Sequence, residues 1–255
     1  MSRVALFVVA LLVGLPVALP AAAEDPAGSL PSVQPPASPA HDAERNPKVQ
    51  DLGNGRFRVG LIEVDRNQRR FTVPAEVHQE EGTQEFVLCT KGGYKGYESV
   101  LEAGATAYEF NVACLLIGLD AKHARTPQYH FDPTGVTGDK VEVSLAWGKD
   151  KEHRQVTAAE AVKDLRSGKA LNATSWVYTG STFTPDGTYM AQTDGVLIGF
   201  VHDPAEIITL AAGTQQGDYG SLVPNTGVLP KKGTRVTVEV KAVAAAPVAP
   251  AAKAE

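Results

Sequence analysis

Glu98 is the acidic residue of this sequence that is best placed for chemistry, because it follows a glycine-rich stretch almost directly. That stretch, Lys91–Gly96, reads KGGYKG and predicts a tight loop. A carboxylate beside such a loop can act as a general base or as a ligand. Lys91 and Lys95 stand nearby, and an ion pair with either lysine would give Glu98 a structural role instead. The sequence leaves both roles open.

Aromatic and hydroxyl side chains alternate in a second segment, Ser175–Ser181, which reads SWVYTGS. Trp176 and Tyr178 fall on one face of the predicted strand, and Ser181 closes it. These three residues, together with Glu98, form the predicted binding site for a small ligand or a glycan. Large aromatic residues also dominate protein cores, so the same pattern is equally typical of an inward-facing strand.

Histidine and aspartate occur close together at His130 with Asp132 and at His202 with Asp203, and His123 precedes the first pair. These residue types suit zinc or copper. Their spacing matches no established metal-binding pattern. The sequence therefore predicts no metal and no other cofactor, and metal handling is the weakest of the functional hypotheses.

The chain contains two cysteines, Cys89 and Cys114. In an oxidising compartment they can form a disulfide that closes a loop of about 26 residues, with a stabilisation of about 3 kcal/mol in the chain-entropy model. Free cysteine is also among the most frequently buried residue types. Both outcomes stay open at this point.

The established short motifs of catalysis are missing from the sequence. It contains no G-x-S-x-G elbow, no H-E-x-x-H helix, no phosphate loop and no dinucleotide fingerprint. We therefore predict no assembled catalytic apparatus, and any enzyme activity would have to be built around Glu98.

The first 23 residues predict a cleaved Sec-type export signal. Arg3 precedes the apolar run Val4–Leu19, and Ala21–Ala23 forms an A-x-A cleavage pattern. Residues 24–48, rich in proline and alanine, predict a linker, and residues 242–255 predict a disordered alanine and proline tail. We expect a periplasmic or secreted protein whose single globular domain covers residues 49–241.

Composition limits the partners of this domain. The chain carries a formal net charge of −5 at pH 7 and has no basic cluster, which argues against nucleic acid as the main partner. No segment after the signal is long and apolar enough to span a membrane. The expected partner is an unidentified envelope protein or a small ligand.

Strands predominate in the predicted domain. Alternation over Phe57–Val64 and Phe71–Val77 predicts two strands, and the latter is placed at an edge or a bulge because Pro74 cannot donate a hydrogen bond. The doubly apolar segment Glu85–Thr90 predicts a central strand. Thr106 and Glu109 are spaced as a capping box, and Gly118 ends the largely buried helix that they begin.

The second half predicts a surface helix over Thr157–Gly168, a strand over Tyr189–Thr193 and a two-residue hairpin turn at Asp194–Gly195. Thr234–Val240 predicts a closing strand. The predicted fold class is therefore α+β and β-rich, with mainly antiparallel sheets, one buried helix and one or two surface helices.

Six segments in this order resemble the YdjY-type domain of exported bacterial proteins: FRVGLIEVDR, FTVPAEVH, KGGYKGYESVL, CLLIGL, WVYTGS and PKKGTRVTVEV. The resemblance covers roughly Leu52–Lys241. It implies an export signal and a small domain of poorly understood function, without an accepted catalytic apparatus. Some related proteins carry a ferredoxin-like label, but a cluster takes four thiolates and this chain has two cysteines.

Two main hypotheses follow. The first is a non-catalytic exported domain that binds a partner or a small ligand in the cell envelope. The second is a hydrolase-like enzyme centred on Glu98, assisted by the hydroxyl groups of Tyr178 or Ser181, which requires these groups to meet within hydrogen-bonding reach.

Overall fold

The computed structural model describes residues 45–171, 175–212 and 220–243. The predicted export signal, nearly all of the predicted linker and nearly all of the predicted tail lie outside these ranges. Among the described helices, none is long and apolar enough to cross a bilayer.

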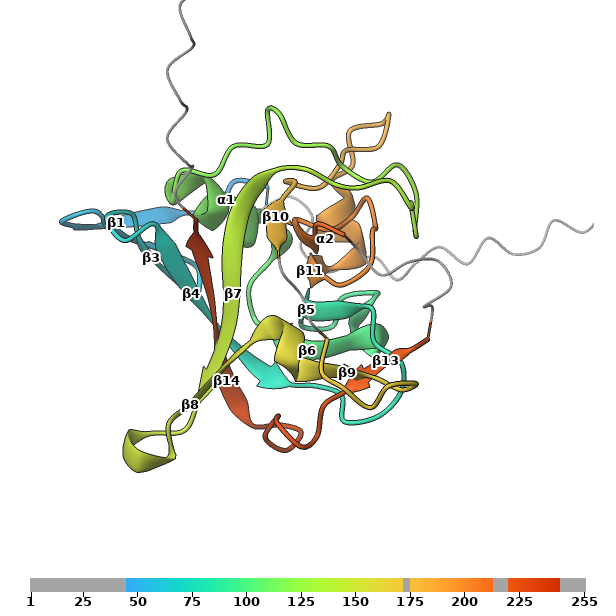
Figure 1. Cartoon of the computed structure of the whole chain (residues 1–255). Helices are drawn as coiled ribbons and strands as arrows, with labels where there is room; N and C mark the ends of the chain where they lie inside the picture. The colour runs from blue at the N-terminus through green and yellow to red at the C-terminus, as the bar shows by residue number, and fades with distance from the viewer. Residues whose placement is uncertain (1–44, 172–174, 213–219, 244–255) are drawn as a thin grey trace, which may run out of the picture. The chain divides into compact units, whose positions relative to one another are not determined.

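Eight strands form one sheet that closes on itself, with the neighbour order β4-β14-β7-β10-β12-β11-β5-β6 and a last pairing from β6 back to β4 (Figure 1). Six neighbouring pairs are antiparallel, whereas β5–β6 and β11–β12 are parallel. The prediction of a β-rich α+β fold is confirmed, but the sheet is less uniformly antiparallel than expected and forms a closed barrel. The barrel strands are β4 (Arg70–Val77), β5 (Phe86–Thr90), β6 (Ser99–Ala103), β7 (Asp139–Trp147), β10 (Trp176–Tyr178), β11 (Val196–Gly199), β12 (Ile208–Leu210) and β14 (Arg235–Ala242).

Shorter elements extend or cover the barrel. Three strands continue the sheet beyond β4 as an antiparallel ribbon, β8 pairs with β7, and β9 pairs with β13 in a separate two-stranded sheet. The strands are β1 (Val49–Gly53), β2 (Arg56–Val59), β3 (Ile62–Asp65), β8 (Arg154–Thr157), β9 (Val162–Asp164) and β13 (Leu222–Pro224). The helical elements are α1 (Ala107–Leu116), α2 (Met190–Asp194) and the 3-10 turns η1 (Gly96–Glu98), η2 (Asp150–Glu152) and η3 (Ala158–Ala161).

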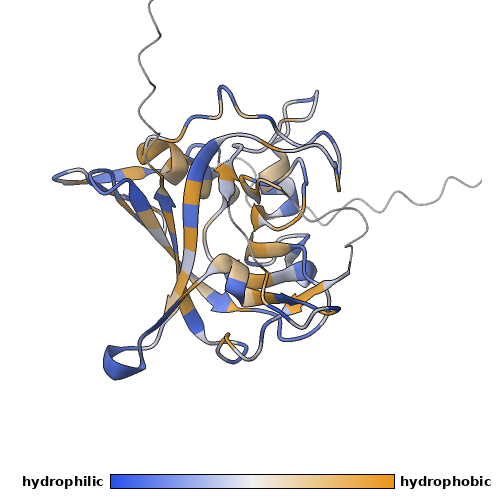
Figure 2. Ribbon diagram, viewed as in Figure 1, coloured by the Kyte–Doolittle hydropathy of each residue, from blue (hydrophilic) through white to orange (hydrophobic). Residues whose placement is uncertain are grey.

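Alternation of side chains sets which face of each long strand is buried. In β14, Val236, Val238 and Val240 are buried, and the residues between them are exposed or half-buried. Figure 2 shows the matching alternation of apolar and polar residues along β7. The period-2 pattern therefore predicted the inner face of the barrel correctly.

Pro74 lies in the interior of the sheet and not at an edge. On one side β4 pairs along its length with β14, whereas on the other side Arg70–Thr72 pair with β3 and Ala75–Val77 pair with β6. Pro74 falls in the gap between these two partners. A residue without a backbone N–H fits where a strand changes neighbours.

Helix α1 begins and ends as its sequence predicts. The backbone N–H of Thr106 donates to the Glu109 carboxylate (2.8 Å), and the N–H of Glu109 donates to the Thr106 hydroxyl (3.2 Å). Gly118 has φ +82°, and the N–H groups of Gly118 and Leu119 close a Schellman motif on the last turn. Phe110, Cys114 and other α1 residues join the principal core, as expected for a largely buried helix, but Leu115 is 51% exposed.

Two arginines of the β3–β4 turn bind the carboxyl-terminal end of α1. Arg69 donates to the carbonyls of Ile117 (3.2 Å) and Gly118 (3.4 Å), and Arg66 donates to that of Leu116 (3.4 Å). A cation at this end also favours the helix dipole.

Replacing Arg69 by alanine is expected to lower the free energy of unfolding by about 1 kcal/mol, because two carbonyls lose a charged donor. Denaturant unfolding measures the change. The matched control is Arg56→Ala on the outer face of β2, which touches none of these carbonyls and should change stability by less than about 0.5 kcal/mol. Equal losses in the two variants would contradict this role for Arg69.

The predicted surface helix over Thr157–Gly168 is wrong. Its capping box does form, since the Thr157 N–H donates to Glu160 at 2.7 Å, but the helix stops after the 3-10 turn η3. The next residues instead form β9, whose Val162 is fully buried and pairs with Pro224. Pairing with a distant strand therefore overrides a weak local helix pattern.

Two predictions on turns are also wrong. Phe57–Val64 is a hairpin and not one strand, because Gly60 adopts φ +55° and Val59 pairs with Ile62. Tyr189–Thr193 is largely helix α2 and not a strand, and Gly195 is its left-handed cap with φ +76°. Asp194–Gly195 therefore ends a helix instead of making a hairpin turn.

Cys89 and Cys114 are free thiols in this structure. Cys89 packs with Phe86, Val196, Val201 and Ala205 in a small second core, whereas Cys114 faces the principal core from α1. Burial raises the pKa of Cys89 to about 12 and that of Cys114 well above its usual value. Of the two alternatives that the sequence left open, the buried free thiols describe these cysteines, and no disulfide joins them.

Candidate functional site

Four segments that are distant in the sequence meet beside the first residue of β5. The Glu85 N–H donates to the Glu98 carbonyl (3.0 Å), which brings η1 next to β5. The Phe200 N–H donates to the Glu85 carbonyl (2.8 Å), and the Phe131 N–H donates to the His202 carbonyl (2.7 Å). The loops around Phe131 and after β11 are thereby joined to the same place.

His130 lies between two nearly buried carboxyl groups. Its Nε2 is 2.9 Å from Glu85 Oε2 and 4.0 Å from Asp203 Oδ2. The side chains of Glu85 and Asp203 are 4% and 8% exposed, whereas that of His130 is 36% exposed and stacks on Phe131. The hydrogen bond to Glu85 raises the pKa of His130, although partial burial opposes the shift.

The ion pair of His130 should therefore stabilise the protein most at low pH. A raised pKa means that the contribution is complete below the unfolded pKa, near 6.5, and is lost as the pH rises through the folded value. Relative to His130→Gln, the wild-type free energy of unfolding is expected to be greater at pH 6 than at pH 9 by about 1 kcal/mol, a value that allows for solvent screening. His153→Gln, at an exposed position, is the control, and a difference independent of pH would contradict the prediction.

Lys95 and Glu98 complete the charged groups of the site. The Lys95 N–H donates to the Asp194 carbonyl (3.0 Å), and its Nζ lies 5.9 Å from the centre of the Phe86 ring, so the side chain reaches toward the start of β5. Burial and then the charge of Glu85 raise the pKa of Glu98, against the opposing effect of Lys95. For Lys95, burial lowers the pKa, but Tyr97 and the surrounding carboxylates raise it above the usual value.

Glycines hold the glycine-rich loop against the end of α2. A Cβ on Gly93 would come within 2.9 Å of the Gly195 Cα and of the Thr90 carbonyl oxygen. A Cβ on Gly195 would come within 2.7 Å of the Gly93 Cα. The backbones at Gly93 and Gly195 are therefore in contact, and neither position has room for a side chain. This close packing positions Lys95 and η1.

Two tyrosines stand at the exposed rim beside these groups. Tyr94 and Tyr97 are 58% and 57% exposed, and their rings meet edge to face with centres 6.5 Å apart. Both lie in the segment that contains Lys95 and Glu98. Exposed aromatic faces next to carboxylates can contact a cation through their π-systems.

The other predicted site residues have structural partners. Trp176 and Tyr178 are 5% and 1% exposed in the principal core, and the Tyr178 hydroxyl donates to Asn111 at 2.7 Å. Ser181 has φ +63° and donates to the Pro204 carbonyl at 3.2 Å. Ser181 therefore fixes the loop that contributes Asp203 to the site, whereas Glu98 lies near Glu85 and His130, whose charges affect its pKa.

Sequence reasoning missed Glu85 and Asp203 as members of the site. Glu85 was assigned to the start of a strand, and Asp203 to a stop signal before Pro204. Neither position carries a motif, so only the pairing of β5 with β11 brings them together. His130 was named, but as a metal ligand.

His202 holds the loop over this site. Its Nδ1 lies 2.7 Å from the Asp132 carbonyl oxygen and its Nε2 3.1 Å from that of Leu210. Over the ranges 45–171, 175–212 and 220–243, no group of three or more histidine, cysteine, aspartate or glutamate side chains is arranged to hold a metal ion. The described residues thus offer no observation in favour of metal handling.

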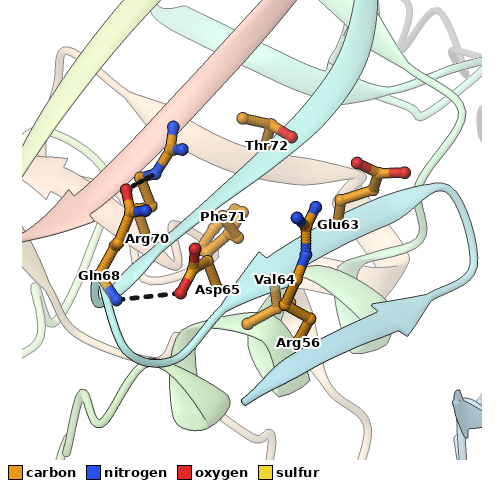
Figure 3. Close-up of a pocket in the computed structure, with 8 residues that line it drawn as sticks. All are labelled: Arg56, Glu63, Val64, Asp65, Gln68, Arg70, Phe71 and Thr72. Atoms are coloured by element: carbon orange, nitrogen blue, oxygen red, sulfur yellow. Dashed lines mark hydrogen bonds between the residues drawn. The ribbon is translucent and has the colours of Figure 1, made fainter. Parts of the chain in front are cut away.

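A hollow of about 150 Å³ lies elsewhere, on the outer face of β2, β3 and β4 (Figure 3). Asp65 is the cross-strand neighbour of both Arg56 and Arg70. Gln68 receives a hydrogen bond from Arg70 (2.8 Å) and donates one to Asp65 (3.0 Å), while Arg70 also pairs with Glu239. The side chains of Arg70, Gln68 and Glu239 thus satisfy one another, which is typical of a solvent-facing ladder of charges.

Fold and site together define a small α+β domain built on a closed sheet, with a carboxylate and histidine cluster formed by the residue before β5 and by two loops. The chain belongs to the YdjY domain family, whose model matches residues 62–241. No curated protein and no solved structure matches the chain. The family resemblance inferred from the sequence is therefore confirmed.

Proposed function

We propose that this protein is an exported, non-catalytic binding domain whose ligand is a small molecule that carries an ammonium group. Export rests on the predicted signal in residues 1–23 and implies a periplasmic or secreted location. The observation that carries the proposal is the convergence of Glu85 and Asp203, both nearly buried, on His130.

The balance of charge supports a cationic ligand. The site contains four carboxyl groups but only two cationic side chains. The cations are Lys95 and His130, and the carboxyl groups are those of Glu85, Glu98, Asp194 and Asp203. Burial and the charge of the neighbouring Asp203 raise the pKa of Asp194, which means that the ionised form of Asp194 is disfavoured in this site. An ammonium group would donate to these oxygens and lie against the rings of Tyr94 and Tyr97.

Calorimetric titration tests the proposal, with cadaverine as the probe and 1,5-pentanediol as its uncharged counterpart. Cadaverine is expected to bind and the diol is not. Glu98→Gln and Asp203→Asn should each weaken binding about tenfold through the loss of a charged acceptor. Glu63→Gln on the exposed face of β3 removes a carboxylate outside the site and should leave binding unchanged.

Equal binding of the diol would refute a cationic ligand, and the absence of any heat with cadaverine would refute the ligand class. Export is tested separately. Intact mass of the protein recovered from the envelope fraction should correspond to a chain that begins at Glu24, and an uncleaved chain there would contradict the signal.

A hydrolase is the second candidate, because the raised pKa of Glu98 is a property of a general acid. The partners within the site would be Glu85 and His130. Tyr178 and Ser181 are less suited, since they already bind Asn111 and Pro204. Hydrolysis of chromogenic glycosides and esters that is lost in Glu98→Gln would support this candidate over simple binding.

A further inference from the structure

Glu206 is a carboxyl group buried directly behind the site. Its exposure is 0%, and neither of its oxygens has a hydrogen-bond partner among the described residues. The Thr209 hydroxyl lies close enough to lower the pKa of Glu206, but it donates to the Val201 carbonyl at 3.0 Å. A polar group that is buried without a partner costs free energy, so a fold that retains one requires an explanation.

The backbone around Glu206 holds this side chain in position. Its own N–H donates to the Asp203 carbonyl (3.1 Å), and its carbonyl accepts from the Thr179 hydroxyl (2.8 Å). Gly199 in β11 leaves the space that the carboxyl group occupies, because a Cβ there would overlap it. The same loop supplies Asp203 to the site, so any change of charge at Asp203 acts at short range on Glu206.

We propose that Glu206 is the internal acid of the binding site: it keeps its proton while the site is empty and releases it when a cation binds beside Asp203. This inference rests on the proposed function. Charge beside Asp203 then stays balanced, since the ammonium group that binds there brings one positive charge and one proton leaves to solvent.

The groups that face Glu206 favour this behaviour. Asp203 on its own loop and Glu85 before β5 are acidic, and Cys89 on β5 is a neutral thiol at working pH. Burial, followed by the charge of Asp203, raises the pKa of Glu206 well above its usual value. Lys95 and His130 already interact with Glu85 and Asp203, and a further cation beside Asp203 would lower the pKa of Glu206.

Proton counting tests the coupling. Cadaverine is titrated calorimetrically at pH 7 in phosphate and in MOPS, neither of which is a primary amine and whose different heats of ionisation reveal the protons exchanged. The wild type is expected to release about one proton for each amine bound, and Glu206→Gln almost none. Glu63→Gln is the control, because it removes an exposed carboxylate outside the site, and it should keep the full release.

A second measurement uses the wild-type protein and therefore does not depend on whether a variant folds. The carbon-13 shift of the Glu206 carboxyl group in the ligand-free protein should be that of the protonated acid at pH 7, and cadaverine should move it toward the ionised value. An ionised Glu206 at pH 7 without ligand, or an unchanged proton count in Glu206→Gln, would overturn the inference and leave amine binding intact. Failure of the wild type to bind cadaverine would instead overturn the proposed function, and the inference with it.

Discussion

Replacing Glu206 by glutamine is expected to stabilise the folded protein increasingly as the pH rises. The folded pKa of Glu206 lies above its unfolded value, so between these two values the native state binds a proton that the unfolded state has lost. Wild-type stability then falls with rising pH, whereas a neutral amide in the same place has no such penalty. The difference between Glu206→Gln and wild type should grow by about 1.4 kcal/mol for each pH unit in this window.

Urea unfolding at a series of pH values from 4 to 8 measures this difference. Near pH 4 both proteins hold a neutral side chain, so their stabilities should be closest there. Glu63→Gln provides the control: its carboxyl group is 53% exposed, so its difference from wild type should be almost constant with pH. A Glu206→Gln difference that stays flat from pH 5 to pH 8 would show that Glu206 is ionised in the native protein.

Local signals predicted parts of this fold well. Helix α1 follows from Thr106, Glu109 and Gly118 because its caps are formed by residues close in sequence. The inner face of β14 follows from three alternating valines. Such features depend on neighbours within a few positions, and those neighbours can be read from the chain.

Features decided by distant partners could not be predicted in this way. Val162 begins strand β9, and not a helix, because Pro224, which is far along the chain, pairs with it. Gly195 matches the signature of a hairpin turn, but its close contact with Gly93 and its place after α2 make it a helix cap. The parallel pair β11–β12 likewise depends on a connection whose course no local pattern specifies.

The site likewise contains residues that local signals predicted and residues that only the fold brings together. Glu98 was identified because a glycine-rich loop precedes it, and the structure places it among charged groups. The other acidic residues of the site, Glu85 and Asp203, carry no motif, and Trp176 and Tyr178 proved to be core residues. Composition at strand spacing cannot separate a pocket from a core, because both favour large aromatic side chains.

Replacing Gly199 by alanine is expected to be among the most destabilising single substitutions in the domain. The backbone of Gly199 does not need the left-handed region, so the penalty comes from overlap between the new methyl group and the Glu206 side chain. Both residues are packed against fully buried neighbours, which leaves little room for relaxation. We expect a loss of about 3 kcal/mol in the free energy of unfolding.

Gly135→Ala separates this overlap from the general effect of adding a methyl group to a glycine. No atom lies within 4 Å of a Cβ at Gly135, so stability there should stay equal or rise slightly. The decisive comparison is a double-mutant cycle with Glu206→Ala, which removes the carboxyl group that the methyl group would meet. In that background Gly199→Ala should cost at least about 2 kcal/mol less than in the wild type. If the two losses simply add, the carboxyl group of Glu206 does not occupy the space at Gly199. That result would contradict the buried position from which we infer that Glu206 is protonated.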